Sequence, residues 1–498
     1  MKKLGILSAS FMGISAIIGS GWLFSPLLAA NIAGPAAIFS WIIGALIILV
    51  LGLCFSEIAS IYPLRGLSAV ITSISHNRFF GFPFAIANWL GIVAVIALEA
   101  DAAVQYLINI FPNLNSLLFN NGAFTFYGNL ICSFLVLLFS VINFWGVSIL
   151  AKTNNVITLI KLFVPIITIV VVGYSVFPKE NFTAINDSLI PYGYSSIIQT
   201  ILVAGIIVSF NGFQTIISFA SEIKNPNKTI PISIAISVIS CLIIYVLIQI
   251  VFIGALPLDV VNKGWKTISM SAPVINLLSM IGLSFMSIII YAGATITPIG
   301  TAINFTGASS RMFTAMAKER QVPVFFDSVH PKYNISRRSL IFNTFVALCF
   351  IFIFKSWGDL AQILGIFHIF SYLTVPVAML VFRENRSAKD YGFYMPFGLV
   401  ICYSLFIIFN ILIGYSNLRL ILYSSLIIIF FELSFICINL KSSMYEIKKN
   451  SLSIAILLIY IVLLPSLSYM NKHLSASDFL IFTFIFSIVF LKILTKFK

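Results

Sequence analysis

A Gly-Ser-Gly triplet at residues 19–21 interrupts the first long apolar segment of the chain, residues 5–30. Glycine loosens a helix and serine competes for backbone hydrogen bonds, so the triplet is poorly suited to the middle of a membrane helix. In lipid an unpaired backbone group is very costly, so a broken helix survives only where its backbone lines a cavity in the protein. The triplet therefore indicates either a binding cavity at mid-membrane or close packing of small residues between helices.

The composition of the chain fixes the class of protein. Of its 498 residues, 60% are hydrophobic and 9% are charged, whereas a soluble domain carries about 25% charged residues. The apolar runs are about twenty residues long, which suits membrane helices rather than barrel strands. We therefore predict an all-α polytopic membrane protein with fourteen spans. The predicted spans cover residues 5–30, 35–61, 83–110, 125–147, 155–177, 196–221, 230–255, 272–305, 339–355, 359–382, 396–414, 418–440, 451–469 and 476–495.

The positive charges follow the topology of a membrane protein. When the spans alternate from a cytoplasmic N-terminus, 22 of the 29 lysines and arginines fall on the cytoplasmic side and 6 on the outer side, and Lys161 lies inside a span. This is the bias that the positive-inside rule requires. It accounts for the net charge of +14 without a nucleic-acid partner. We expect a multi-pass protein of the cytoplasmic (inner) membrane with both termini in the cytoplasm.

Enzyme chemistry has no support in the sequence. The six cysteines all lie in apolar spans, which argues against disulfides and against a metal site. Nucleotide-binding loops, zinc-binding spacings and nucleophile constellations are absent from the sequence. We therefore expect a protein that is not an enzyme and needs no cofactor and no metal.

A second interrupted span lies about 190 residues after the first. Residues 208–214 read Val-Ser-Phe-Asn-Gly-Phe-Gln in the middle of the predicted span 196–221, and Asn-Gly is a turn-forming pair. Two broken helices at corresponding positions in two halves are a sequence indicator of a transporter binding site. Spans 1–5 and 6–10 would be inverted repeats, because an odd number of spans reverses the second copy.

Several motifs resemble those of the amino acid–polyamine–organocation permeases. The Gly-Ser-Gly triplet with Phe24 and Pro26 resembles the first-helix motif of that family, and residues 210–213 resemble its sixth-helix break. Residues 222–231 and 311–323 resemble the segments that follow the sixth and eighth helices. The resemblance covers spans 1–10 well and spans 11–14 weakly.

The resemblance implies a LeuT-like 5+5 inverted repeat with alternating access. It divides the chain into a transporter core, residues 1–390, and a C-terminal four-helix extension, residues 391–498. Two departures from the family pattern stand out: Leu67 replaces a second glycine after Gly66, and Gln214 stands where arginine–agmatine exchangers carry a glutamate. The second departure argues against acid sensing by that route.

The resemblance also implies a substrate site. The substrate carboxylate would meet the backbone amides of Ser20 and Gly21, and the substrate ammonium would meet backbone carbonyls of the first and sixth helices. A zwitterion needs donors at one end and acceptors at the other, and a broken helix pair supplies both. The residues assigned to this site are Ile17, Gly19, Ser20, Gly21, Val208, Ser209, Phe210, Asn211 and Gly212, and the carbonyls are those of Ile17, Val208 and Asn211.

Three ionisable residues inside spans are candidates for proton coupling. Lys161 lies in the fifth span, where a lysine is costly and by default functional, and proton-coupled members of the resembled family have a lysine at this place. The alternative is a lysine that snorkels to the inner surface. Glu99 and Asp101 lie in the third span, about 200° apart around a helix, so they cannot both face one cavity.

Other polar and aromatic residues leave two interpretations each. Phe210 is either part of an aromatic gate over the substrate or a packing residue. His368 in the tenth span is either a hydrogen-bonded interior residue or a proton relay. For Glu57, at the inner end of the second span, we expect a loop contact with Arg65 or Arg78.

The sequence therefore predicts a secondary transporter of amino acids, with proton-coupled symport as the first hypothesis and amino acid or amine exchange as the alternative. A nutrient sensor would need a long soluble segment, and a channel would need charged rings or repeated filter loops; neither is visible. The expected partners are an amino acid, protons and the lipid bilayer. The substrate can be neutral, acidic or cationic, because all three share the backbone-binding part. Spans 11–14 fit either a homodimer contact or a scaffold.

Overall fold

The structure, a computed structural model, describes residues 3–64, 66–120, 122–145, 148–175, 179–333, 335–354, 356–385, 387 and 390–496. Some of the basic residues in the predicted charge distribution lie outside the described residues: Lys2, Arg65, Lys355, Arg386, Lys389 and Lys498.

The described chain is almost entirely helical. Its α-helices are α1 (Ile6–Ile17), α2 (Gly21–Ala33), α3 (Ala37–Ile61), α4 (Leu67–Ser75), α5 (Arg78–Ile108), α6 (Pro112–Leu118), α7 (Phe126–Phe144), α8 (Ser148–Ser175), α9 (Tyr194–Val203), α10 (Ile206–Ser209), α11 (Gln214–Ser218), α12 (Pro226–Ala255), α13 (Leu258–Val261), α14 (Pro273–Met280), α15 (Ser287–Lys318), α16 (Arg337–Ile353), α17 (Trp357–Tyr372), α18 (Thr374–Glu384), α19 (Gly398–Gly414), α20 (Leu418–Lys449), α21 (Ser451–His473) and α22 (Ala476–Lys496). The short elements are the 3-10 turns η1 (Gly34–Ala36), η2 (Lys179–Phe182), η3 (Asn211–Phe213), η4 (Ala220–Glu222), η5 (Trp265–Thr267), η6 (Ser284–Met286) and η7 (Val324–Asp327), and the antiparallel strands β1 (Phe119–Asn120) and β2 (Ala123–Phe124).

Each of the fourteen predicted spans contains helix among the described residues, although fewer of these helices have the length and composition of a complete membrane span. Among the described residues, ten helices are long and apolar enough to cross a membrane, and the bent pair formed by α9 with α10 and α11, which turns by 51°, brings the number to eleven. The predicted span 5–30 corresponds to α1 and α2, and the predicted span 196–221 corresponds to α9–α11. The prediction of an all-α polytopic membrane protein is confirmed.

Polar side chains set the starts of several helices. The Asn77 side chain accepts a hydrogen bond from the backbone N–H of Phe80 at the start of α5. Ser356 accepts one from the N–H of Asp359 at the start of α17. Such caps satisfy N–H groups that have no partner within the helix, so the polar residue fixes where the apolar helix begins.

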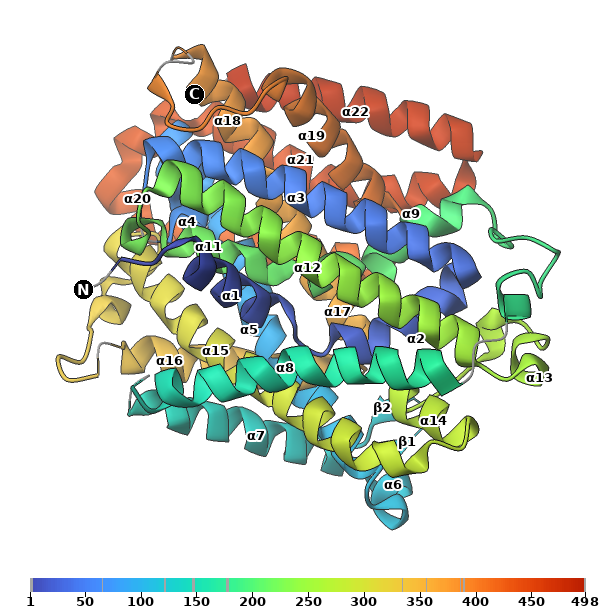
Figure 1. Ribbon diagram of the computed structural model, residues 1–498. Coiled ribbons are helices and arrows are strands. Elements are labelled where there is room, and N and C mark those ends of the chain that lie inside the picture. Colours follow the sequence, from blue (N-terminus) through green and yellow to red (C-terminus); the bar gives the residue numbers. More distant parts are fainter. Residues whose placement is uncertain are drawn as a thin grey trace.

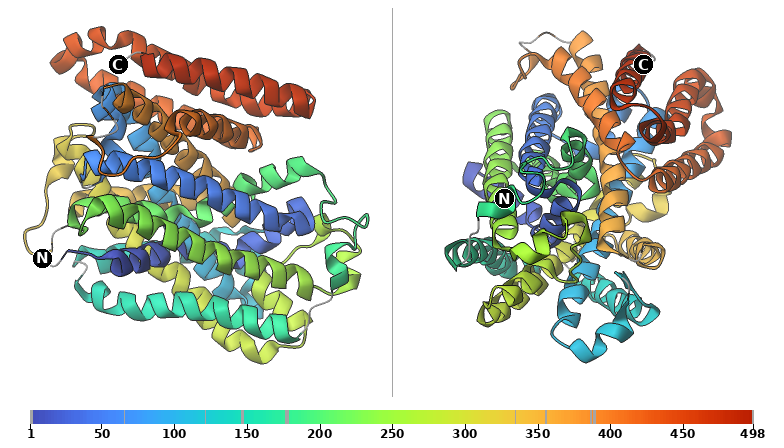
Figure 2. Two further views of the ribbon diagram at one scale, coloured as in Figure 1. Left: turned by 45° about the horizontal axis from the view of Figure 1, so that its top comes forward. Right: turned by 90° about the vertical axis from the view of Figure 1, so that its right-hand side faces the viewer.

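The long helices run side by side, and the two marked ends of the chain lie at the same end of the bundle (Figures 1 and 2). α6, β1, β2, α13 and α14 lie at the opposite end (Figure 1). α5 is almost completely buried, and it packs against α4, α15, α16 and α17. α19–α22 form the orange and red layer of Figure 1 and contact the rest of the bundle through α3, α5, α9, α17 and α18.

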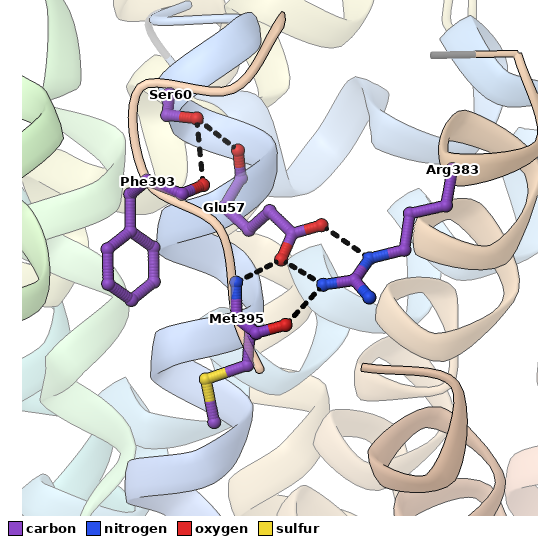
Figure 3. A network of polar contacts seen from close by, with 5 residues as sticks. All are labelled: Glu57, Ser60, Arg383, Phe393 and Met395. Atoms are coloured by element: carbon purple, nitrogen blue, oxygen red, sulfur yellow. Dashed lines mark hydrogen bonds and ion pairs between the residues drawn. The ribbon is translucent and has the colours of Figure 1, made fainter. Parts of the chain in front are cut away.

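A buried ion pair between Glu57 and Arg383 joins three separate segments of the chain (Figure 3). Both oxygens of the Glu57 carboxylate accept from the Arg383 guanidinium, at 2.7 and 2.6 Å. Glu57 also accepts from the backbone N–H of Met395 at 2.7 Å. The bonds of Glu57 therefore connect α3 to the last turn of α18 and to the segment before α19.

The predicted contact between Glu57 and Arg78 is wrong. Arg78 instead pairs with Glu446 of α20, at 2.9 Å. The other predicted partner, Arg65, lies outside the described residues. The reason is that α18, more than 300 positions later in the sequence, packs beside α3 and brings Arg383 to Glu57.

Candidate functional site

The two helix breaks lie against each other at the centre of the bundle. α1 ends at Ile17 and α2 begins at Gly21, while η3 separates α10 from α11. A Cβ atom added to Gly212 would collide with the backbone of Ala16 and Ile17, and one added to Gly21 would collide with the Ser209 hydroxyl. Glycine is required at both positions because only a hydrogen side chain lets the two broken chains approach this closely.

A carboxylate of the protein itself accepts hydrogen bonds from the backbone amide at the first break. The backbone N–H of Ser20 donates to both oxygens of Glu99, at 3.1 and 3.0 Å. Glu99 comes from α5 and is 4% exposed. Ser20 lies at the N-terminal end of α2, where the free N–H groups and the helix dipole favour an anion. Glu99 thus already accepts from one of the two backbone amides that were predicted to bind the substrate carboxylate.

An ammonium group lies at the other side of the same break. The Lys161 Nζ of α8 donates to the Ser15 carbonyl of α1 at 2.9 Å and to the Thr301 hydroxyl of α15 at 2.6 Å. Thr301 lies 3.4 Å from the Ile18 carbonyl. The carbonyls at the C-terminal end of α1 favour a cation. Lys161 is fully buried and points to α1, so it does not snorkel to the inner surface.

Two aromatic residues that the sequence did not single out hold the broken backbone. The Tyr245 hydroxyl of α12 lies 3.1 Å from the Ile17 carbonyl and 3.1 Å from the Ser209 carbonyl. The Trp357 indole N–H of α17 donates to the Ser20 hydroxyl at 2.9 Å. One carbonyl predicted to bind the substrate ammonium, that of Ile17, therefore already has a hydrogen-bond partner within the protein.

A small central cavity adjoins these groups, and a larger vestibule lies outside it. The cavity has a volume of about 30 Å³ and the vestibule one of about 760 Å³. Phe24 and Trp357 stack with ring centroids 5.0 Å apart, and Trp357 lines both spaces. The vestibule reaches β1 and α14, at the end of the bundle away from the termini. Small-molecule sites measure about 300–1,000 Å³, so in this conformation the central site is closed.

Most of the predicted site residues come together around this cavity. Those that line it are Ile17, Gly19, Gly21, Glu99, Val208, Ser209, Asn211 and Gly212. Ser20 takes part through its bond to Glu99. The lining residues that sequence reasoning missed are Ala16, Val95, Leu98, Thr301, Phe305 and Trp357.

Four predicted residues do not line the cavity: Ser20 and Lys161 bond to residues that do, whereas Phe210 and Asp101 lie elsewhere. Phe210 is fully buried between Trp41 and Tyr245, with ring centroids 6.0 and 5.2 Å away, which is the packing interpretation rather than the gate. Asp101 faces away from Glu99, as the helical spacing predicts, and lies beside Cys132 of α7.

Comparison with known proteins agrees with this architecture. The sequence profile of the amino acid permease family matches residues 4–436. The chain belongs to the amino acid permease family. This confirms the resemblance to the amino acid–polyamine–organocation permeases, and the permease is an amino acid transporter of the membrane.

Three bacterial relatives of the permease have named substrates, all in Bacillus subtilis (strain 168). The glutamate/serine transporter AimA is 38% identical over 401 residues, covering 80% of this chain and 74% of that protein. An aspartate-proton symporter is 30% identical over 416 residues, covering 83% and 79%. The serine/threonine exchanger SteT is 26% identical over 401 residues, covering 79% and 86%.

Proposed function

We propose that this permease carries an amino acid together with a proton by alternating access. The observation that carries the proposal is the pair of charges at the first break, with the Glu99 carboxylate on the Ser20 amide and the Lys161 ammonium on the Ser15 carbonyl. The pair occupies the same helix ends that would receive the carboxylate and the ammonium of a zwitterion. The aspartate-proton symporter among the relatives supports the proposal that a proton travels with the amino acid.

Competition for the Ser20 amide provides the coupling. A carboxylate accepts a hydrogen bond roughly twice as strong as a neutral acceptor does, so the Glu99 anion holds this amide firmly. Uptake of one proton by the pair leaves Lys161 as an ammonium and Glu99 as a neutral carboxyl group. The neutral carboxyl group releases the amide N–H, which then donates to the substrate carboxylate. Asp101, which lies outside the cavity, has no part in this step.

The substrates of the relatives suggest a substrate class. Glutamate, aspartate, serine and threonine appear in their names, and all four carry oxygen in the side chain. We infer that this permease also takes an amino acid of this kind.

Uptake by proteoliposomes tests the proposal. The experiment measures the uptake of each amino acid from a mixed labelled set, with and without an inward proton gradient, in wild type, Lys161→Ala and Glu99→Gln. We expect uptake driven by the gradient in wild type and loss of that drive in both variants. Lys263→Ala is the matched control, because Lys263 is an exposed lysine in the loop after α13.

The exchanger alternative gives a different result in the same assay. Uptake that ignores the gradient and the Lys161 substitution, but rises when the vesicles are preloaded with an amino acid, would contradict symport and establish exchange. The presence of a serine/threonine exchanger among the relatives is the reason to include the measurement with preloaded vesicles.

We also propose the orientation and division of the chain. Both termini face the cytoplasm in the inner membrane, residues 1–390 form the transporter core, and residues 391–498 form the four-helix extension. The support is that both marked ends of the chain lie at one end of the bundle (Figure 2), together with the bias of basic residues. A reporter fused to the C-terminus that is active only in the periplasm would contradict the orientation.

A further inference from the structure

Two hydrogen bonds hold the side-chain amide of Asn211 at the second break, and a third fixes its partner His368. Its Nδ2 lies 2.8 Å from the His368 Nε2, and the His368 Nδ1 lies 2.9 Å from the Leu364 carbonyl. The Tyr372 hydroxyl donates to the Asn211 Oδ1. Asn211, His368 and Tyr372 are all buried, so the three groups form a closed polar chain inside the bundle.

The Leu364 carbonyl decides the direction of every bond in this chain. A carbonyl only accepts, so the His368 Nδ1 carries the hydrogen. A neutral imidazole has one such hydrogen, so the His368 Nε2 accepts, and the Asn211 nitrogen must face it. The flipped amide would require an imidazolium in an apolar interior, which is costly. The nitrogen of Asn211 is therefore held towards His368 and its oxygen towards Tyr372.

One N–H of Asn211 remains for the cavity that this residue lines. An amide nitrogen has two hydrogens, and His368 takes one. Other polar side chains of the cavity already have partners: Ser209 donates to the Gly205 carbonyl, Thr301 accepts from Lys161, and Glu99 accepts from Ser20. Asn211 thus offers the cavity a donor that is not committed within the protein.

We propose that this N–H donates to an oxygen of the substrate side chain, which makes Asn211 a specificity residue and His368 and Tyr372 positioning residues. The inference rests on the proposed function, because it requires that the cavity receives an amino acid. Asn211 directly precedes Gly212, where the two breaks touch, so a substrate held by the first break places its side chain towards Asn211. Carboxylate, hydroxyl and amide oxygens satisfy the donor, whereas an aliphatic side chain leaves it unpaired.

The pair L-serine and L-alanine isolates this contact, since the two amino acids differ by one hydroxyl group. A net hydrogen bond favours the hydroxyl substrate by about twofold to tenfold, and a buried donor left unpaired by the wrong substrate adds to the discrimination. We expect wild type to prefer serine over alanine by about tenfold in kcat/KM. The same preference applies to L-threonine over 2-aminobutyrate.

Two variants and one matched control test the proposal in proteoliposomes. Asn211→Leu removes the donor, and Tyr372→Phe removes the hydroxyl that holds the amide in place. Tyr460→Phe is the control, because the Tyr460 hydroxyl also donates to an asparagine oxygen, that of Asn410 in α19, at 2.7 Å. We expect the ratio of serine to alanine uptake to fall to near one in Asn211→Leu, to fall partly in Tyr372→Phe, and to keep its wild-type value in Tyr460→Phe.

The outcomes separate this inference from the proposed function. A wild-type ratio near one, or an unchanged ratio in Asn211→Leu, overturns the role of Asn211 while amino acid transport stands. If Asn211→Leu does not fold, the ratio in Tyr372→Phe decides, and an unchanged ratio there refutes the positioning role. A wild-type protein that moves neither amino acid, nor any other in the mixed set, defeats the proposed function itself.

Discussion

Removal of the Glu57 carboxylate is expected to cost about 3–5 kcal/mol of unfolding free energy, the range for breaking a buried pair by deleting one partner. The carboxylate accepts three hydrogen bonds of 2.6–2.7 Å. In Glu57→Ala the Met395 N–H loses its acceptor, and the Arg383 guanidinium keeps only the Met395 carbonyl. Because the Arg383 side chain is 14% exposed, water can reach it in part, so the cost should lie near 3 kcal/mol. Such a loss lowers the ratio of folded to unfolded protein by roughly a hundredfold or more.

A double-mutant cycle in mixed detergent micelles measures this energy. Unfolding of wild type, Glu57→Ala, Arg383→Met and the double variant is followed by tryptophan fluorescence as the denaturing detergent increases. The double variant should be less destabilised than the sum of the two single variants, because each single variant leaves one charge without its partner and the double variant leaves none. Arg78→Met is the matched control, since Arg78 pairs with Glu446, which is 54% exposed, and exposed pairs contribute about 0–1 kcal/mol. A loss below about 1 kcal/mol in Glu57→Ala, or strict additivity, would refute the reasoning.

Further predictions concern the breaks and one helix end. Gly212→Ala should abolish uptake, because the added methyl group overlaps the first break, whereas Gly5→Ala, which meets no atom, should retain it. Trp357→Phe keeps an aromatic ring beside Phe24 but loses the donor to the Ser20 hydroxyl, so kcat/KM should fall by about tenfold. The Asn181 amide donates to the Ile253 carbonyl near the end of α12 at 2.8 Å and to the Leu256 carbonyl just after it at 2.7 Å, so Asn181→Ala should lower the unfolding free energy by about 1–3 kcal/mol in the same detergent titration.

The breaks and the buried charges were predictable because they stand out from an apolar background. Glycine beside serine or asparagine in mid-span, and Lys161 in a run of aliphatic residues, have few structural uses in a membrane helix. The helical spacing of Glu99 and Asp101 was enough to predict that one would face the cavity without the other. These inferences need only local sequence and the physics of lipid.

The remaining site residues were not predictable because ordinary side chains gain their roles from helix packing. Tyr245 and Trp357 resemble many other aromatic residues of the chain until α12 and α17 bring their polar atoms to the breaks. Arg383 reaches Glu57 only because α18 lies beside α3. Phe210 sits within the second break, yet its ring turns into the core.

The two charges at the first break bear on how the permease responds to the membrane voltage. With Glu99 as a carboxylate and Lys161 as an ammonium, the opposite charges cancel within one site. A single charge that crosses a potential of 100 mV gains or loses about 2.3 kcal/mol, whereas a neutral pair does almost no electrical work. The substrate-free carrier would then reorient at a rate that does not depend on voltage. The electrical energy of the membrane would act on the step in which the added proton travels with a zwitterion.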